Sequence, residues 1–291
     1  MIIDRLYESV KNKGNVCVGL DTSPEYIPNC FLKEHDNLED GLFDFNKRII
    51  DAVSDVCACF KVQIAYYEAL GLAGLLAYKR TLKYIKNCGC ISIADIKRGD
   101  IANTARMYAK AHFTGDFESD FVTLSPYMGF DSLEPYLDYV RDFEKGIFIL
   151  VRTSNKGAFD IQYMEDKRGI KVYRHVADKV CKIASYYKGK CGYSSIGGVI
   201  GCTHVDEDAA LRRDFGDMFM LIPGYGAQGG TAGDVAVYLR GGNGGIVNSS
   251  RGILLSYKKH EDGEKKFDMY ARDEVIEMRE AIWNAAGIRN E

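Results

Sequence analysis

Eight short, continuously apolar runs are spaced along the 291-residue chain, and longer segments with helical periodicity lie between most of them. Runs that are apolar at every position are typical of parallel strands buried on both faces. Strands that alternate with helices predict βαβ units, and eight such units match an α/β fold of the (β/α)8 barrel type. The expected strands are Val16–Leu20, Cys57–Val62, Ile91–Ala94, Phe121–Leu124, Ile147–Val151, Ile196–Ile200, Met218–Ile222 and Ile246–Val247.

The segments between these runs are consistent with one barrel domain over residues 1–291. We find no linker rich in Pro, Gly or Ser and no internal repeat, and a doubly wound open sheet is the alternative fold. The connections Thr22–Glu39 and Thr153–Lys171 are long enough to be insertions after the first and fifth strands. The expected helices are Leu42–Val53, Ala69–Ile85, Thr104–Phe113, Ser132–Phe143, Val172–Tyr187, Asp206–Phe215 and a charged terminal helix, Glu264–Ala286.

Composition excludes several classes of protein. The net charge of -3 argues against nucleic acid as the main partner. No apolar run approaches ~18 residues, so we expect no membrane span. The N-terminal stretch is amphipathic and does not have the apolar run of a signal peptide. These features predict a cytoplasmic protein.

The nine cysteines agree with that location. Their number is odd, and the close pairs Cys57/Cys59 and Cys88/Cys90 have C-x-C spacing and not the C-x-x-C spacing of zinc sites. We therefore expect reduced thiols, as in cytosolic proteins. A metal site at Cys202 and His204 is a weak alternative, and we expect no metal.

Charged and polar side chains stand where three early strands end. Asp21 follows the first strand, Lys61 and Gln63 end the second, and Asp95 and Lys97 end the third. Residues i and i+2 of a strand point the same way, and the carboxyl ends of barrel strands meet at one mouth, where active sites lie. Carboxylates near Lys97 favour its charged form. A charged lysine can donate a proton and stabilise a developing carbanion.

A glycine-rich segment after the seventh strand predicts a phosphate site. Gly224, Gly226 and Gly229 follow the letters of the dinucleotide motif G-x-G-x-x-G. That motif belongs early in a chain, with an acidic residue ~20 positions later at a strand tip, and here no acid follows. Barrels often bind phosphate with the loops after strands 7 and 8. Arg251, after the eighth strand, supplies a planar fork for phosphate oxygens.

The segment after the third strand carries a known motif. Asp95-Ile96-Lys97-Arg98-Gly99-Asp100-Ile101 is an instance of D-x-K-x-x-D, and the extended form D-x-K-R-G-D-I-x-x-T-A ends at Ala105. On this motif the chain resembles the orotidine 5′-phosphate decarboxylase suprafamily, in its longer-chain bacterial branch. The resemblance covers nearly the whole chain, through the further blocks Val18-Gly19-Leu20-Asp21, Phe60-Lys61, Thr153-Ser154-Asn155, Pro223-Gly224 and Ser250-Arg251-Gly252.

The resemblance implies an enzyme without metal or organic cofactor that converts orotidine 5′-monophosphate to UMP and CO2 in pyrimidine biosynthesis. Lys97 would protonate C6, and Asp95 would face the substrate carboxylate. Asp21 and Lys61 would hold the ribose hydroxyls, and Ser154 would bind the pyrimidine ring. The implied catalytic residues are Lys97, Asp95, Asp100 and Lys61, and the implied substrate-binding residues are Asp21, Lys61, Gln63, Ile101, Thr104, Ser154, Pro223, Gly226, Gln228 and Arg251.

Two of these implied roles involve more than one subunit or more than one side chain. Asp100 and Thr104 would reach into the neighbouring subunit's site, which makes a homodimer obligatory. Gln228 and Arg251 would bind the phosphate, with a backbone donor at Gly226. The chain departs from the family at Lys156, where proline is common, and this bears on the stiffness of the loop.

Three other functions are compatible with the residues. A sugar-phosphate decarboxylase or aldolase-type synthase of the same suprafamily also carries D-x-K-x-x-D and depends on magnesium. A Schiff-base aldolase would use Lys61 or Lys97. A non-catalytic barrel would bind the nucleotide without turnover.

Overall fold

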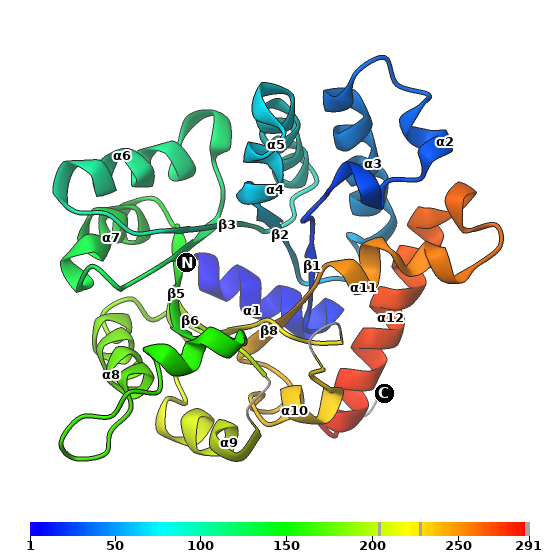
Figure 1. Cartoon of the computed structure of the whole chain (residues 1–291). Helices are drawn as coiled ribbons and strands as arrows, with labels where there is room; N and C mark the ends of the chain where they lie inside the picture. Colours follow the sequence, from blue (N-terminus) through cyan, green and yellow to red (C-terminus); the bar gives the residue numbers. More distant parts are fainter. Residues whose placement is uncertain (203–204, 227–228, 289–291) are drawn as a thin grey trace.

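A closed barrel of eight parallel strands forms the centre of the protein (Figure 1). The structure is a computed structural model and describes residues 1–202, 205–226 and 229–288. Each strand pairs with its sequence neighbours, and β1 pairs with β8 to close the ring. The strands are β1 (Val16–Gly19), β2 (Cys59–Gln63), β3 (Ser92–Arg98), β4 (Phe121–Leu124), β5 (Gly146–Arg152), β6 (Ile196–Ile200), β7 (Met220–Ile222) and β8 (Gly245–Ser249).

Helices surround the ring, as Figure 1 shows. Short 3-10 turns, η1 (Pro24–Tyr26) to η6 (Gly263–Lys265), lie in the connections. The α-helices are α1 (Ile2–Lys13), α2 (Asn29–Leu32), α3 (Leu38–Val53), α4 (Ile64–Glu68), α5 (Gly71–Asn87), α6 (Ala102–Phe113), α7 (Glu134–Asp142), α8 (Val172–Ala184), α9 (Val205–Asp214), α10 (Ala232–Ala236), α11 (Arg251–Leu254) and α12 (Phe267–Ala285).

Closure of the ring confirms the predicted barrel and excludes the open sheet. All eight apolar runs lie on strands, but several boundaries differ. The second and seventh strands begin two residues later than expected, at Cys59 and Met220. The third strand continues past Ala94 to Arg98, where a register shift lets it pair with β4 again. Hydrophobicity alone cannot reveal that extension, because its last residues are charged.

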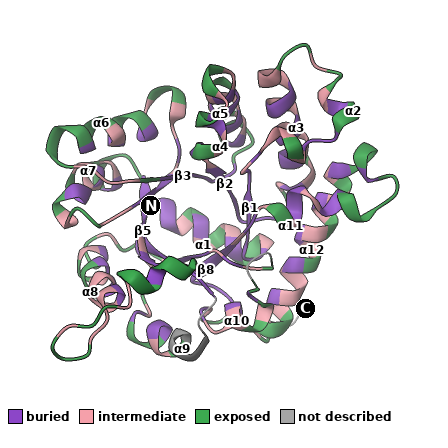
Figure 2. Cartoon of the chain, viewed as in Figure 1, coloured by how far each residue is buried: buried purple, intermediate pink, exposed green. Residues whose placement is uncertain are grey.

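Helix α1 closes the amino-terminal end of the barrel. Its residues Ile2, Ile3, Leu6 and Val10 are buried. They belong to one apolar cluster with barrel residues such as Phe121, and this buried interior is purple in Figure 2. The spacing of these four residues places them on one helical face. The amphipathic stretch therefore has a structural role that the sequence analysis left unassigned.

The two long connections contain little regular structure. The connection after β1 holds η1 and α2, and the connection after β5 holds η4 (Lys156–Asp160) and an isolated bridge between Glu165 and Lys171. Within the described residues no helix has the length and apolar character needed to cross a membrane. All nine cysteines lie in the described part of the chain, and none of them forms a disulfide.

Candidate active site

Four charged side chains form a continuous chain of ion pairs at the carboxyl end of the barrel. Lys61 Nζ lies 2.8 Å from Asp21 Oδ1 and 3.0 Å from Asp95 Oδ2. Lys97 Nζ lies 2.7 Å from Asp95 Oδ1. Gln63, two residues beyond Lys61, donates a hydrogen bond of 2.9 Å to Asp95 Oδ2. The structure thus brings together all five side chains that the strand ends predicted to meet.

Burial makes these pairs strong. The side chains of Lys61 and Asp95 are only 6% and 7% exposed, whereas that of Lys97 is 45% exposed. Burial by itself would lower the pKa of Lys61, but Asp21 and Asp95 outweigh it and raise that pKa well above the ordinary value. Burial would raise the pKa of Asp95, but Lys61 and Lys97 outweigh it and hold that pKa well below its ordinary value. Both groups are therefore charged at neutral pH.

The charge chain borders a cavity of about 330 Å³. Lys61, Asp95 and Lys97 form its charged wall, and Leu150, Val199 and Leu221 supply apolar surface. Ser154 and Pro223, both expected at the site, also line it. A mostly apolar cavity with one charged wall can hold a flat ring while it places a polar substituent against the charges.

A second cavity of about 360 Å³ adjoins the first, and Pro223 and Asn248 line both. Its wall includes Asp21, Gly224 and Arg251, so the guanidinium expected to bind phosphate stands beside the charge chain. The exposed Arg251 begins helix α11 after β8. This arrangement offers an anion site next to a ring-sized cavity.

The glycine-rich segment has the backbone that its residues predict. Gly224, Gly226 and Gly229 have φ values of 107°, 67° and 92°, in the left-handed region that favours glycine. The Gly226 N–H donates to the Gly230 carbonyl at 2.9 Å, so this expected phosphate donor is engaged within the loop. Gln228, the other expected phosphate ligand, lies outside the described residues, as does His204 of the alternative metal site.

Asp100, Ile101 and Thr104 lie apart from the charge chain. Asp100 Oδ1 accepts a hydrogen bond of 2.8 Å from the Ile101 N–H, and no described contact joins its carboxylate to Lys97. Ile101 and Thr104 are exposed at the start of α6. The role of Asp100 and Thr104 in a neighbouring subunit's site, which the family resemblance implies, stays a prediction.

Ser250 is a member of the site that the sequence analysis missed. Its hydroxyl donates to Asp21 Oδ2 at 2.8 Å, while Lys61 binds the other oxygen of the same carboxylate. Gly19 makes room for it, because a Cβ at Gly19 would lie 1.9 Å from Ser250 Oγ. The available signal was its position directly before Arg251, at the end of an expected strand.

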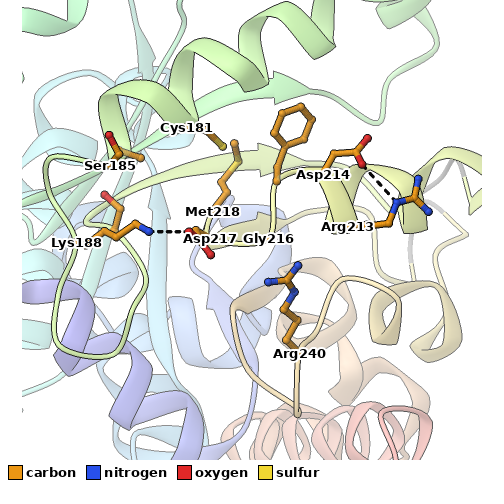
Figure 3. A pocket seen from close by; sticks show the side chains of 12 residues that line it. Cys181, Ser185, Lys188, Arg213, Asp214, Gly216, Asp217, Met218 and Arg240 are labelled. Atoms are coloured by element: carbon orange, nitrogen blue, oxygen red, sulfur yellow. Dashed lines mark hydrogen bonds and ion pairs between the residues drawn. The ribbon is translucent and has the colours of Figure 1, made fainter.

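Another hollow, of about 300 Å³, lies away from the mouth (Figure 3). Its residues come from segments that lead into β6, β7 and β8, at the amino ends of these strands. Two ion pairs lie there, Lys188 with Asp217 at 2.6 Å and Arg213 with Asp214 at 3.4 Å, and Arg240 donates to the Arg212 carbonyl at 3.4 Å. Because active sites of barrels lie at the carboxyl ends of the strands, we place the candidate site at the mouth.

Among the described residues, no group of three or more His, Cys, Asp or Glu side chains is arranged to hold a metal ion. The carboxylates at the mouth are engaged by lysines instead, since Asp21 and Asp95 share Lys61. Cys202, half of the alternative metal site, donates from Sγ to the Pro223 carbonyl at 3.4 Å.

Comparisons with known proteins agree with this geometry. The sequence profile of the orotidine 5′-phosphate decarboxylase / HUMPS family matches residues 14–265. The chain belongs to this family. It is 61% identical over 290 residues to a protein of Clostridium kluyveri and 62% identical over 285 residues to one of Clostridium tetani. Both are named orotidine 5′-phosphate decarboxylase, and the alignments cover 100% and 98% of this chain and 100% and 99% of the relatives.

Solved structures of the orotidine 5′-phosphate decarboxylase family share the fold. A putative orotidine 5′-phosphate decarboxylase from Streptomyces avermitilis superposes with a TM-score of 0.81 at 28% identity, over 98% of this chain and 95% of that one. The OMP decarboxylase of Leishmania donovani gives a TM-score of 0.76 at 27% identity, over 98% of both chains. Membership at this level of identity makes the chain an enzyme, a carboxy-lyase.

Proposed function

We propose that the chain decarboxylates orotidine 5′-monophosphate to UMP and CO2 in pyrimidine biosynthesis, without metal or organic cofactor. The observation that carries the proposal is the ion-pair chain from Asp21 through Lys61 and Asp95 to Lys97, beside a cavity that contains Arg251. The names of relatives that are 61% and 62% identical support the same reaction.

In this proposal Lys97 is the proton donor. The bond between C6 and the carboxylate breaks, CO2 leaves, and the electron pair that remains on C6 takes a proton from the Lys97 ammonium. Asp95 Oδ1 lies 2.7 Å from Lys97 Nζ and holds the ammonium in place before the reaction. The neutral amine then regains a proton from solvent, which its 45% exposed side chain can reach.

The second cavity would bind the 5′-phosphate. Arg251 can hold two phosphate oxygens through its guanidinium, and Asp21 and Lys61, between the two cavities, would hold the ribose hydroxyls. Gln228 belongs to the proposed phosphate site on the family resemblance alone. Binding energy from the phosphate could then align the reacting ring with the charge chain.

We also propose that residues 1–291 act as one catalytic domain in a cytoplasmic homodimer. Asp100, Ile101 and Thr104 make no described side-chain contact with their own charge chain, and Ile101 is 51% exposed. A second subunit that received these side chains would complete its site with them. The reduced cysteines agree with the proposed location.

The proposed function is tested by following the loss of absorbance of orotidine 5′-monophosphate in the presence of EDTA. We expect full turnover with chelator, because the proposed chemistry uses only protein charges. Loss of activity that magnesium restores would favour the metal-dependent decarboxylase or synthase. Binding of UMP without turnover would favour the non-catalytic barrel, and trapping of the substrate by borohydride would favour the Schiff-base aldolase.

The shared site is tested by mixing two inactive variants, Lys97→Ala and Asp100→Ala. In a hybrid dimer one of the two sites regains both wild-type residues, so random exchange of subunits should restore about a quarter of the wild-type activity. The measurement is turnover after incubation of the two proteins at equal concentration. Exchange of subunits, shown by mass spectrometry, without a return of activity would contradict the shared site.

A further inference from the structure

The backbone that presents Lys97 is irregular. Between Ala94 and Arg98 the register of β3 against β4 shifts, because Ala94 pairs with Val122 and Arg98 pairs with Leu124. Three residues of β3 therefore stand opposite a single residue of β4, Thr123. Lys97 has a φ of 45°, in a region that side-chain-bearing residues rarely adopt.

This irregularity breaks the hydrogen bonding of the strand pair. The N–H groups of Ile96 and Lys97 do not meet β4 carbonyls in a regular ladder, and buried backbone donors without partners destabilise a fold. Ile96 is buried, so water does not replace the lost partner. Another acceptor has to satisfy these two donors for the backbone to hold its shape.

The Thr123 hydroxyl is that acceptor. Its Oγ1 accepts from the Ile96 and Lys97 N–H groups, each at 3.0 Å, and donates to Asp95 Oδ1 at 2.8 Å. A hydroxyl has one donor proton and two acceptor lone pairs, so these three bonds use all of them. Thr123 is 1% exposed, and it lines the cavity beside Asp95 and Lys97.

We propose that Thr123 is the positioning residue of the proton donor. One hydroxyl fixes the backbone from which Lys97 projects and also the carboxylate that binds the Lys97 ammonium. Asp95 Oδ1 accepts hydrogen bonds from both Thr123 Oγ1 and Lys97 Nζ, at 2.8 and 2.7 Å. The Thr123 hydroxyl is thereby hydrogen-bonded both to the main chain of Lys97 and to the carboxylate that binds the Lys97 ammonium. This inference rests on the proposed function of Lys97.

The test compares Thr123→Val with Thr123→Ser. Valine keeps the branched shape and removes the hydroxyl, whereas serine keeps the hydroxyl and removes a methyl group. We expect Thr123→Val to lower kcat about 10- to 100-fold, the range for loss of a hydrogen bond to a charged group. KM should change by less than about threefold, because the contacts proposed for phosphate and ribose are elsewhere. Thr123→Ser should keep kcat within about threefold of wild type.

Ser119→Ala is the matched control. Ser119 is 2% exposed and stands just before β4, and its Oγ, with one proton to donate, lies 3.0 and 3.1 Å from the carbonyl oxygens of His112 and Phe121. The Ser119→Ala variant shows the effect of removing a buried hydroxyl at the end of the barrel opposite the candidate site. We expect thermal stability to fall while kcat stays unchanged.

The outcomes separate this inference from the proposed function. Wild-type protein that does not turn over orotidine 5′-monophosphate contradicts the proposed function itself. Active wild type with an equally active Thr123→Val variant overturns only the positioning role, as does a drop in kcat that serine does not rescue. If Thr123→Val does not fold, Thr123→Cys, with a thiol that is a weaker donor, takes its place and should lower kcat to an intermediate value.

Discussion

Replacement of Lys97 by alanine is expected to lower kcat at least about 10⁴-fold, since it removes both the proposed proton donor and a positive charge beside the developing carbanion. The side chain is 45% exposed and its Nζ contacts only Asp95 among the described ion pairs, so the fold should survive. The measurement is single-turnover decarboxylation, together with the affinity for UMP. We expect UMP binding to persist, because the cavity that contains Arg251 is unchanged.

Lys83→Ala is the control for this variant. Lys83 is exposed on α5 and is more than 4 Å from any described carboxylate, so its removal changes net charge by the same amount without touching the site. It should retain wild-type kcat. Turnover by Lys97→Ala within about tenfold of wild type would remove Lys97 from the role of proton donor.

Replacement of Asp95 by alanine is expected to lower the free energy of unfolding by about 3–5 kcal/mol, as well as to abolish turnover. Removal of the carboxylate leaves the buried Lys61 ammonium with Asp21 as its remaining ion-pair partner. Urea titration of both proteins measures the difference. The carboxylate's described partners are Lys61, Lys97, Gln63 and Thr123.

The pH dependence of that difference has a definite sign. The pKa of Asp95 is lowered in the folded state, so its contribution to stability is complete above the unfolded value of 3.8 and is lost as the pH falls through the folded value. The pKa of Lys61 is raised, so its contribution is complete below 10.5 and is lost only at higher pH. The gap between wild type and Asp95→Ala should therefore be constant from about pH 5 to 9 and narrow in strong acid.

Asp55→Ala provides the comparison for stability. Asp55 pairs with Arg272 at 2.5 Å, but the two side chains are 63% and 36% exposed. Exposed pairs contribute at most about 1 kcal/mol. A loss in Asp95→Ala no larger than that in Asp55→Ala would show that the charge chain at the mouth does not stabilise the fold.

The barrel could be predicted from sequence because burial on both faces leaves a simple mark, an unbroken apolar run. The same reasoning predicted which charged residues end the strands and meet. It predicted that Asp95 and Lys97 lie together because residues i and i+2 of a regular strand point the same way. That reason is incomplete. The regular alternation of side chains along a strand does not hold at Lys97, because this residue has a φ of 45° and the end of β3 is irregular. Thr123 of the neighbouring strand accepts hydrogen bonds from the Ile96 and Lys97 N–H groups in this irregular segment.

Residues that act by hydrogen bonding were harder to find. Thr123 lies inside an apolar run, and Ser250 follows one, so neither changes the hydrophobic pattern. Their roles depend on which strand is the neighbour and on its register, which only the closed ring defines. Asp100 shows the converse: the motif groups it with Lys97, but within the described residues its carboxylate accepts a hydrogen bond from the Ile101 N–H and does not contact Lys97. The spacing of residues along the sequence does not show whether a side chain contributes to the active site of its own subunit or to that of another subunit.

The two terminal helices both bury side chains in the protein core. The family match spans residues 14–265, which leaves α1 and α12 outside it. A protein trimmed to that match would lose the helix that seals the barrel floor and would uncover interior aromatic rings such as Phe121. It would also lose Phe267, which stacks on Phe45 at 4.8 Å between ring centroids. Fusion partners and truncations should therefore spare both helices, because each contributes buried side chains to the packing of the barrel.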